Sequence, residues 1–164
     1  MSIVLFRVDE RLIHGQVVVG WGTQLRPDRI VVVDDGLADS QWEQELYTLG
    51  LPTELESSFE HVEEARTHLQ EWRDSKDRIM VLTRDIHTML LLAEGGLLRG
   101  DEINIGGIHH ANGREPVLPY VFLSAAETRE LSQLSDEGAL VSARDLPGAR
   151  RVAVEALLKN HRHL

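Results

Sequence analysis

The sequence has no cysteine, which excludes a disulfide framework and thiol catalysis. It contains no apolar run near the roughly 18 residues of a membrane-spanning helix, and its first residues lack the pattern of a secretory leader. It has no basic excess either, because 27 acidic residues outnumber 17 lysines and arginines and leave a net charge of −10. Such a balance disfavours a nucleic-acid-binding surface. We therefore expect a cytoplasmic protein that neither binds nucleic acid nor inserts into a membrane.

Nothing in the 164 residues marks a boundary between domains. There is no internal repeat, no low-complexity tract and no linker rich in proline and serine. A chain of this length can bury a hydrophobic core without disulfides or metals to support it. We expect one domain over residues 1–164.

Short apolar runs alternate with longer amphipathic ones, which is typical of an α/β protein with a mainly parallel sheet. The apolar runs predict strands at residues 2–8, 29–33, 53–57, 78–82, 102–105, 117–123 and 139–143. Helical spacing and stop signals predict helices at residues 16–25, 40–51, 59–74, 86–94, 124–136 and 149–160. Ser40 with Glu43, and Ser124 with Glu127, fit the capping-box pattern at the start of two of these helices.

One histidine, His14, lies where the first predicted strand gives way to the first predicted helix. The first N–H groups of a helix have no intrahelical partners and carry the positive end of its dipole, so an anion settles readily there. Arg7 and Arg11 flank the turn and supply guanidinium donors suited to phosphate oxygens. Imidazole is a good nucleophile at neutral pH, and Asp9 or Glu10 could hold its second nitrogen. One interpretation is a histidine that accepts a phosphoryl group; the other is a polar surface histidine in a loop.

Acids and glycines also follow other predicted strands. Asp34 and Asp35 have three interpretations: a metal or phosphate-acceptor pair, a group that orients the His14 site, or caps of the next segment. Gly106 and Gly107 allow the backbone to approach a ligand or a neighbouring loop closely. Because ligands of open α/β sheets bind at the carboxyl ends of the strands, we expect these residues to share one rim with His14.

The run Thr83-Arg84-Asp85 follows the fourth predicted strand and is expected at the same rim. It either supplies a hydroxyl and a guanidinium to a phosphate, or begins a helix with Thr83 or Asp85 as its cap. His109 and His110 are adjacent, so their side chains diverge in most backbones, which disfavours a shared metal site.

A resemblance to a known family rests mainly on eleven consecutive residues, Arg7-Val8-Asp9-Glu10-Arg11-Leu12-Ile13-His14-Gly15-Gln16-Val17. They resemble the signature of the mannose/fructose/sorbose-family IIB components of the bacterial sugar phosphotransferase system, in which the motif's histidine carries the phosphoryl group. The resemblance extends through nearly the whole chain, at Val33, Asp34, Asp35, Ala38, residues 104–107, Ser124, Gly138 and Pro147. Two positions depart from it, because Glu10 stands where Asp is more frequent and Ser40 where an acid is usual.

The resemblance implies a three-layer α/β/α sandwich with a mainly parallel sheet of order 3-2-4-1-5-6 and room for an extra edge strand. It implies that His14 accepts a phosphoryl group from a phosphorylated IIA protein. The group then passes to a sugar bound by a membrane permease of IIC and IID subunits. The implied activity is that of a protein-N(pi)-phosphohistidine–sugar phosphotransferase component, which needs no metal or organic cofactor. Self-association is left open.

The same resemblance suggests a role for each residue at the rim. His14 would be the nucleophile, Asp9 would steady its ring, and the phosphoryl oxygens would be neutralised by Arg11, Arg7 and the amides near Gly15 and Gln16. Orienting or supporting roles would fall to Asp34, Asp35, Thr83, Arg84, Asp85, Gly106 and Gly107.

Two other functions compete with sugar phosphorylation. A regulatory module could carry a phosphorylatable histidine that signals to a protein partner without feeding a sugar. A small hydrolase could use Asp34 and the histidines with a metal. If the protein serves transport, phosphate transfer depends on sugar, whereas a regulatory module is phosphorylated without sugar. A metal-dependent hydrolase would be inhibited by a chelator.

Overall fold

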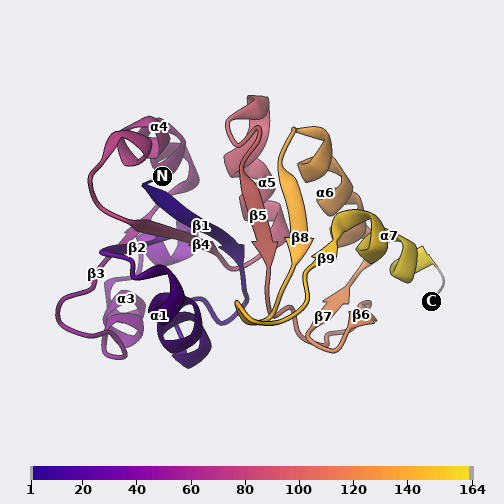
Figure 1. Ribbon diagram of the computed structural model, residues 1–164, viewed down its shortest axis with the longest axis horizontal. Helices are drawn as coiled ribbons and strands as arrows, with labels where there is room; N and C mark the ends of the chain where they lie inside the picture. Colours follow the sequence, from indigo (N-terminus) through magenta and orange to yellow (C-terminus); the bar gives the residue numbers. More distant parts are fainter. Residues whose placement is uncertain (1, 163–164) are drawn as a thin grey trace.

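A computed structural model describes residues 2–162 of the chain, without the side chains of 160–162. Its middle layer is a seven-stranded sheet of order β3-β2-β4-β1-β5-β8-β9 (Figure 1). Neighbouring strands pair in parallel, except that β8 and β9 are antiparallel. The strands of this sheet are β1 (Ile3–Val8), β2 (Arg29–Val33), β3 (Glu56–Glu60), β4 (Ile79–Thr83), β5 (Glu102–Ile105), β8 (Leu140–Ala143) and β9 (Val152–Ala153).

Helices cover both faces of the sheet, which confirms the three-layer α/β/α fold (Figure 1). One face carries η1 (Gln16–Trp21), α1 (Gly22–Leu25), α2 (Asp35–Ala38) and α3 (Gln41–Thr48). The other carries α4 (Val62–Asp74), α5 (Ile86–Ala93) with the short η2 (Glu94–Gly96), α6 (Ala125–Asp136) and α7 (Val154–Arg162). In the described residues, no helix combines the length and apolar character that crossing a bilayer requires.

The central strands are buried on both faces and divide the core into two clusters. Val31 and Val33 of β2 pack with α4 and α5, whereas Ile30 and Val32 of the same strand pack with η1 and α2. Side chains alternate across a strand, so a continuous apolar run fits only a strand that is covered on both sides. This explains why the valine-rich runs were reliable signals for the middle of the sheet.

The expected order of the first five strands, 3-2-4-1-5, is confirmed. The sixth position differs, because β8 pairs with β5 there. Residues 117–123, expected as strand six, instead belong to a separate antiparallel pair, β6 (Glu115–Leu118) and β7 (Val121–Leu123). Pro116 and Pro119 lack the N–H that a central strand must donate, so this segment cannot continue the main sheet.

Some element boundaries also differ from expectation. The third strand lies at Glu56–Glu60 rather than 53–57. The capping box at Ser124 is formed, but the one expected at Ser40 is wrong, because the Ser40 side chain makes no capping hydrogen bond. The preceding turn holds Ser40 at φ −122° and ψ 89°, away from the extended conformation typical of a capping residue.

Candidate functional site

The loops after β1, β4 and β5 meet at the carboxyl ends of these three strands. The Asp9 amide donates to the Thr83 carbonyl at 3.0 Å, and the Glu10 amide donates to the Gly107 carbonyl at 2.9 Å. The Gly106 amide donates to the carbonyl of Val8 at 2.7 Å. The rim predicted from the strand pattern therefore exists for these loops.

Asp9 is the fully buried centre of this rim. Its Oδ2 accepts from Arg7 Nη2 at 3.0 Å and from the Gly107 amide at 3.2 Å, and its Oδ1 accepts from the Arg11 amide at 3.1 Å. Burial raises the pKa of Asp9, but the hydrogen bonds from Arg11 and the charge of Arg7 outweigh it and leave that pKa below its usual value. Asp9 is thus a charged carboxylate that fixes both loops.

Arg7 is also fully buried, and its guanidinium points into the protein. Nη1 donates to Asn104 Oδ1 and, at 2.8 Å, to the Arg144 carbonyl, while Nη2 donates to the Asp145 carbonyl at 3.1 Å. The guanidinium carbon lies 5.1 Å from the centre of the Trp21 ring, a cation–π geometry. With these groups occupied, Arg7 cannot reach a phosphate in solvent, and we reassign it from phosphate contact to positioning of Asp9.

His14 lies at the edge of the same network, with 16% of its side chain exposed. Its Nδ1 is 2.9 Å from the carbonyl of Leu12, a residue held at a positive φ of 54°. Because a carbonyl only accepts, Nδ1 carries the proton in this conformation and Nε2 holds the lone pair. Nε2 is covered, has no hydrogen-bond partner among the described residues, and lies 3.9 Å from Asp9 Oδ2.

Arg11 and Gln16 are next to His14 and face outward more than Arg7 does. Arg11 Nη2 donates to Gln16 Oε1 at 2.9 Å, and 35% of the Arg11 side chain is exposed. Gln16 begins η1, a π-helical segment, and such segments are frequent at functional sites. Gly15 is exposed, and apart from its two chain neighbours no described residue comes within 4 Å of where its Cβ would be. The expected phosphate-binding residues other than Arg7 therefore share the open side of the loop.

Burial lowers the pKa of His14; the Leu12 carbonyl and the Asp9 charge oppose this effect only in part. The unfolded chain then binds more protons than the folded one as the pH falls below the ordinary histidine value, so folding loses stability in that range. We expect an NMR titration of His14 to give a midpoint below about 6.5, the value of an unperturbed histidine. A midpoint at or above that of the same chain in urea would contradict this prediction.

Asp34 and Asp35 act as caps. Asp34 Oδ1 accepts from the Leu37 amide at 2.9 Å and caps α2, and Asp35 Oδ1 accepts from the Val62 amide at 2.9 Å at the start of α4. Asp34 also pairs with Arg84, whose Nε is 3.5 Å from Oδ2. Within the described part of the chain, no three histidine or acidic side chains are grouped to hold a metal ion. These contacts favour the capping interpretation over the metal one.

The Thr83-Arg84-Asp85 run also fits the structural interpretation. Asp85 caps α5, accepting from the Thr88 amide at 2.7 Å. Thr83 is fully buried, and its hydroxyl donates to the Asp85 carbonyl at 3.0 Å. Arg84 and Asp85 are both partly exposed, and 42% of the Arg84 side chain is accessible.

The two glycines after β5 are needed for close packing. A Cβ at Gly106 would lie 2.7 Å from Arg7 Nε, and nearer still to the rest of its guanidinium. A Cβ at Gly107 would lie 3.3 Å from Arg11 Nη2 and 3.4 Å from Asp9 Oδ1. Any side chain at position 106 would therefore collide with the buried Arg7 side chain.

Sequence reasoning missed a second ion-pair network beside the first. Glu10 Oε1 accepts from Arg114 Nη1, and Arg114 also forms two hydrogen bonds with Glu127, at 2.9 and 2.8 Å. Glu127 is the capping-box residue of α6, so the loop after β1 is tied to that helix. The capping-box pattern marked Glu127, but nothing in the sequence pairs it with an arginine thirteen residues earlier.

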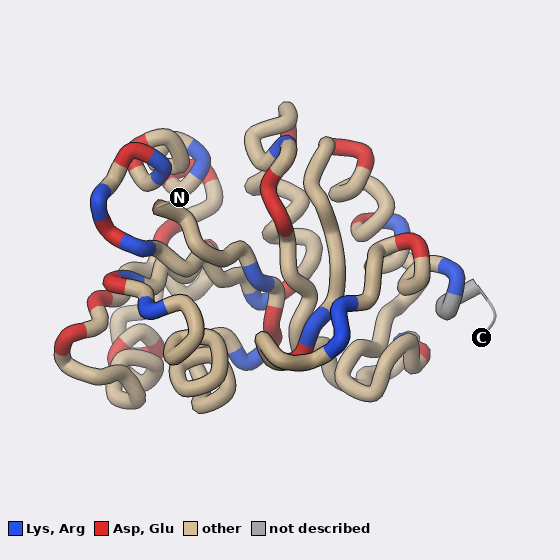
Figure 2. The backbone as a smooth tube through the Cα atoms, viewed as in Figure 1, with Lys and Arg blue, Asp and Glu red and all other residues tan. Residues whose placement is uncertain are grey.

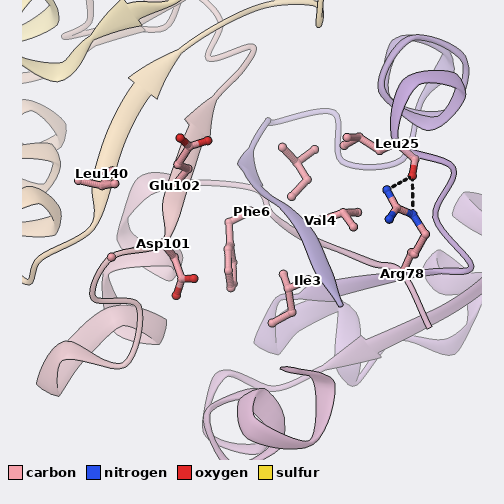
Figure 3. A pocket seen from close by; sticks show the side chains of 10 residues that line it. Ile3, Val4, Phe6, Leu25, Arg78, Asp101, Glu102 and Leu140 are labelled. Carbon is pink, nitrogen blue, oxygen red and sulfur yellow. Dashed lines mark hydrogen bonds between the residues drawn. The ribbon is translucent and has the colours of Figure 1, made fainter. Parts of the chain in front are cut away.

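A cavity of about 610 Å³ lies away from His14, between the first halves of β1, β5 and β8 (Figure 3). Ile3, Val4 and Phe6 line one side, and Asp101, Glu102 and Leu140 line the other. Arg78 closes one end by donating to the Leu25 carbonyl at 2.8 and 2.6 Å. A pocket at the amino ends of parallel strands is opposite the rim where ligands of such sheets bind, so we do not place the site there.

Near the carboxyl ends of β1, β5 and β8, in the lower centre of Figure 2, segments with lysine or arginine lie beside segments with acidic residues. At these strand ends Arg7 donates to the Arg144 carbonyl in the loop after β8, and Arg11 pairs with Asp9. Because Arg7 is buried and paired with Asp9, the positive charge that this rim offers to an anionic group comes mainly from the partly exposed Arg11.

Comparisons with known proteins agree on one family. The family model described as the PTS system sorbose subfamily IIB component matches residues 3–164. The N-acetylgalactosamine-specific phosphotransferase enzyme IIB component 1 of Escherichia coli (strain K12) is 28% identical over 160 residues, with 92% of this chain and 94% of that protein covered. The fructose-specific EIIB component of Bacillus subtilis (strain 168) is also 28% identical, with 98% of each chain covered.

A solved structure agrees as well. The crystal structure of the N-acetylgalactosamine-specific IIB component 1 from Escherichia coli has a TM-score of 0.80 and 26% identity, with 92% of this chain and 97% of that one covered. IIB components of this system are phosphotransferases that carry a phosphoryl group from a IIA protein to a sugar during its uptake, with IIC and IID subunits as partners. Because the family model spans nearly every residue, the chain belongs to the sorbose subfamily of IIB components of the phosphotransferase system.

Proposed function

We propose that His14 accepts the phosphoryl group from a phosphorylated IIA protein and passes it to a sugar held by a IIC/IID permease. The observation that carries this assignment is the position of His14, a partly exposed ring beside the buried Asp9 carboxylate and the outward-facing Arg11. The family motif gives the same residue. We further propose that residues 1–164 act as one domain in the cytoplasm, because donor and permease must reach His14 from the same side of the membrane.

We propose Nδ1, the N(pi) atom, as the position of phosphorylation. Nε2 is covered and lies 3.9 Å from Asp9 Oδ2, so an anionic phosphoryl group at Nε2 would face a carboxylate. In the reactive form the ring breaks its hydrogen bond to the Leu12 carbonyl and carries its proton on Nε2. The Nε2–H group then donates a hydrogen bond to Asp9. The Nδ1 lone pair is then free to attack phosphorus.

The transfer exchanges one nitrogen–phosphorus bond for another. The Nδ1–P bond forms as the bond between phosphorus and the donor imidazole breaks, and the donor ring leaves with that electron pair. Phosphoryl transfer of this kind depends on positioning and on neutralising charge on the three oxygens. Arg11 and the amides near Gly15 and Gln16 supply that charge, and no metal or organic cofactor takes part.

Arg11→Lys should keep the positive charge but slow phosphoryl transfer roughly tenfold, because lysine lacks the forked donors that hold both Asp9 and an oxygen of the phosphoryl group. The measurement is the rate of labelling from a phosphorylated IIA protein. Arg129→Lys, at an exposed position on α6, is the matched control and should transfer normally. Equal rates for the two variants would remove Arg11 from the site.

The test of the whole proposal is labelling with phosphoenolpyruvate, the general phosphotransfer proteins and a IIA protein. The labelled residue and its phosphohistidine isomer are then identified. We expect N(pi)-phosphohistidine at position 14 and its loss when sugar and membranes with IIC and IID are added. Labelling that is indifferent to sugar would instead favour a regulatory module.

A further inference from the structure

A second imidazole, that of His109, borders the loop that carries His14. It follows the two glycines after β5. The position that a Cβ would take on Gly107 lies 3.3 Å from His109 Nε2 and 3.3 Å from Arg11 Nη2. The same position lies 3.4 Å from Asp9 Oδ1. His109 Nε2 and Arg11 Nη2 therefore approach the same point over Gly107, whose carbonyl accepts from the Glu10 amide in the loop that carries His14.

The backbone of His109 is held in place, whereas its ring is open to solvent. The His109 amide donates to Glu10 Oε1 at 3.1 Å, and its carbonyl accepts from Arg114 Nη1 at 2.8 Å. His109 Nδ1 lies 3.8 Å from Glu10 Oε2, and 53% of the side chain is exposed. The Nδ1 side thus faces a carboxylate, and within the described part of the chain Nε2 has no hydrogen bond that would keep it from a ligand.

We propose that His109 contacts the phosphoryl group on His14, donating from Nε2 to one oxygen beside the oxygen held by Arg11. This inference rests on the proposed function of His14. A ring between the Glu10 carboxylate and a phosphoryl group has an anion on each side, and its protonated form donates to both. His109 then neutralises charge as the phosphoryl group moves between nitrogens.

The neighbouring histidine supplies a matched control. The His110 ring lies edge-on to Phe122 of β7, with centroids 5.8 Å apart and planes at 86°. The two adjacent side chains therefore diverge, as expected from the sequence, and His110 is engaged away from Arg11. Replacing His110 also removes an imidazole from this loop, but one that does not lie near Arg11.

The experiment compares phosphoryl transfer from a phosphorylated IIA protein to wild type, His109→Ala, His109→Gln and His110→Ala. We expect His109→Ala to lower the rate at saturating IIA by roughly ten- to a hundredfold, with little change in the KM for IIA. His109→Gln keeps an N–H donor near the Nε2 position and should recover part of the rate. His110→Ala should transfer as wild type does.

Three outcomes would overturn the role of His109. They are a wild-type rate in His109→Ala, a loss confined to the KM for IIA, which indicates docking, and equal losses in the alanine and glutamine variants. Thermal melts check that the variants fold, and the half-exposed ring gives little reason for them not to. Failure of the underlying function is distinguishable, because wild type would then carry no label on His14.

Discussion

Replacing His14 with alanine should leave a folded chain that takes up no phosphate from a phosphorylated IIA protein. The ring forms one hydrogen bond, from Nδ1 to the Leu12 carbonyl, and packs at the edge of the loop rather than in the core. Its removal should cost about 1 kcal/mol of folding stability. Transfer should be lost completely, since no other group on this loop combines a nucleophilic nitrogen with the Asp9–Arg11 pair.

Labelling with radioactive phosphoenolpyruvate, alongside a urea denaturation curve, measures both effects. His87→Ala is the control, because His87 is 61% exposed and pairs with Glu130 of α6, outside the Asp9 network. That variant should be labelled as wild type is. A labelled His14→Ala chain would show that the phosphoryl group enters elsewhere, and the function proposed for His14 would be rejected.

Gly106→Ala should produce the largest loss of stability among single-methyl additions at this rim. A Cβ there would lie 2.7 Å from Arg7 Nε, so the guanidinium must move. Any movement weakens its bonds to Asp9, Asn104 and two carbonyls, and leaves a charge without partners in the core. Breaking a buried pair in this way typically costs about 3–5 kcal/mol.

The free energy of unfolding in urea is the quantity to measure. Gly15→Ala is the matched control, because Gly15 has helical dihedral angles of −52° and −45°, and nothing lies within 4 Å of its Cβ position. This second variant should lose no stability. If the two alanine variants had equal stability, the packing of Arg7 against Gly106 would not be a constraint on the fold.

The sequence predicted the middle of the sheet well, because strands buried on both faces need continuous apolar runs such as Ile30–Val33. It failed at residues 117–123, where apolar content suggested a sixth strand. The deciding feature was the pair Pro116 and Pro119, which removes the N–H groups that a strand beside β5 would need. Apolar content alone therefore does not place a segment in the main sheet.

At the site, the loop pattern predicted that His14 and Asp9 lie in one loop. It did not predict how deeply each side chain of the loop is buried. Arg7 and Arg11 look equivalent in the sequence, being four residues apart around one turn. Arg7 is nevertheless buried. Its guanidinium is stabilised there by acceptors that include two backbone carbonyls, those of Arg144 and Asp145. A backbone carbonyl carries no residue-type signal, so nothing in the sequence could have revealed this pairing.

Those carbonyls also affect how the protein is completed during synthesis. Arg7 is translated more than 130 residues before Arg144 and Asp145, whose carbonyls accept its hydrogen bonds. Until then the guanidinium has no full set of partners, and enclosing it in the core is unfavourable. The loop that carries His14 therefore reaches its final form only after Arg144 and Asp145 have been made, and a product truncated before them should lack the full set of partners for Arg7.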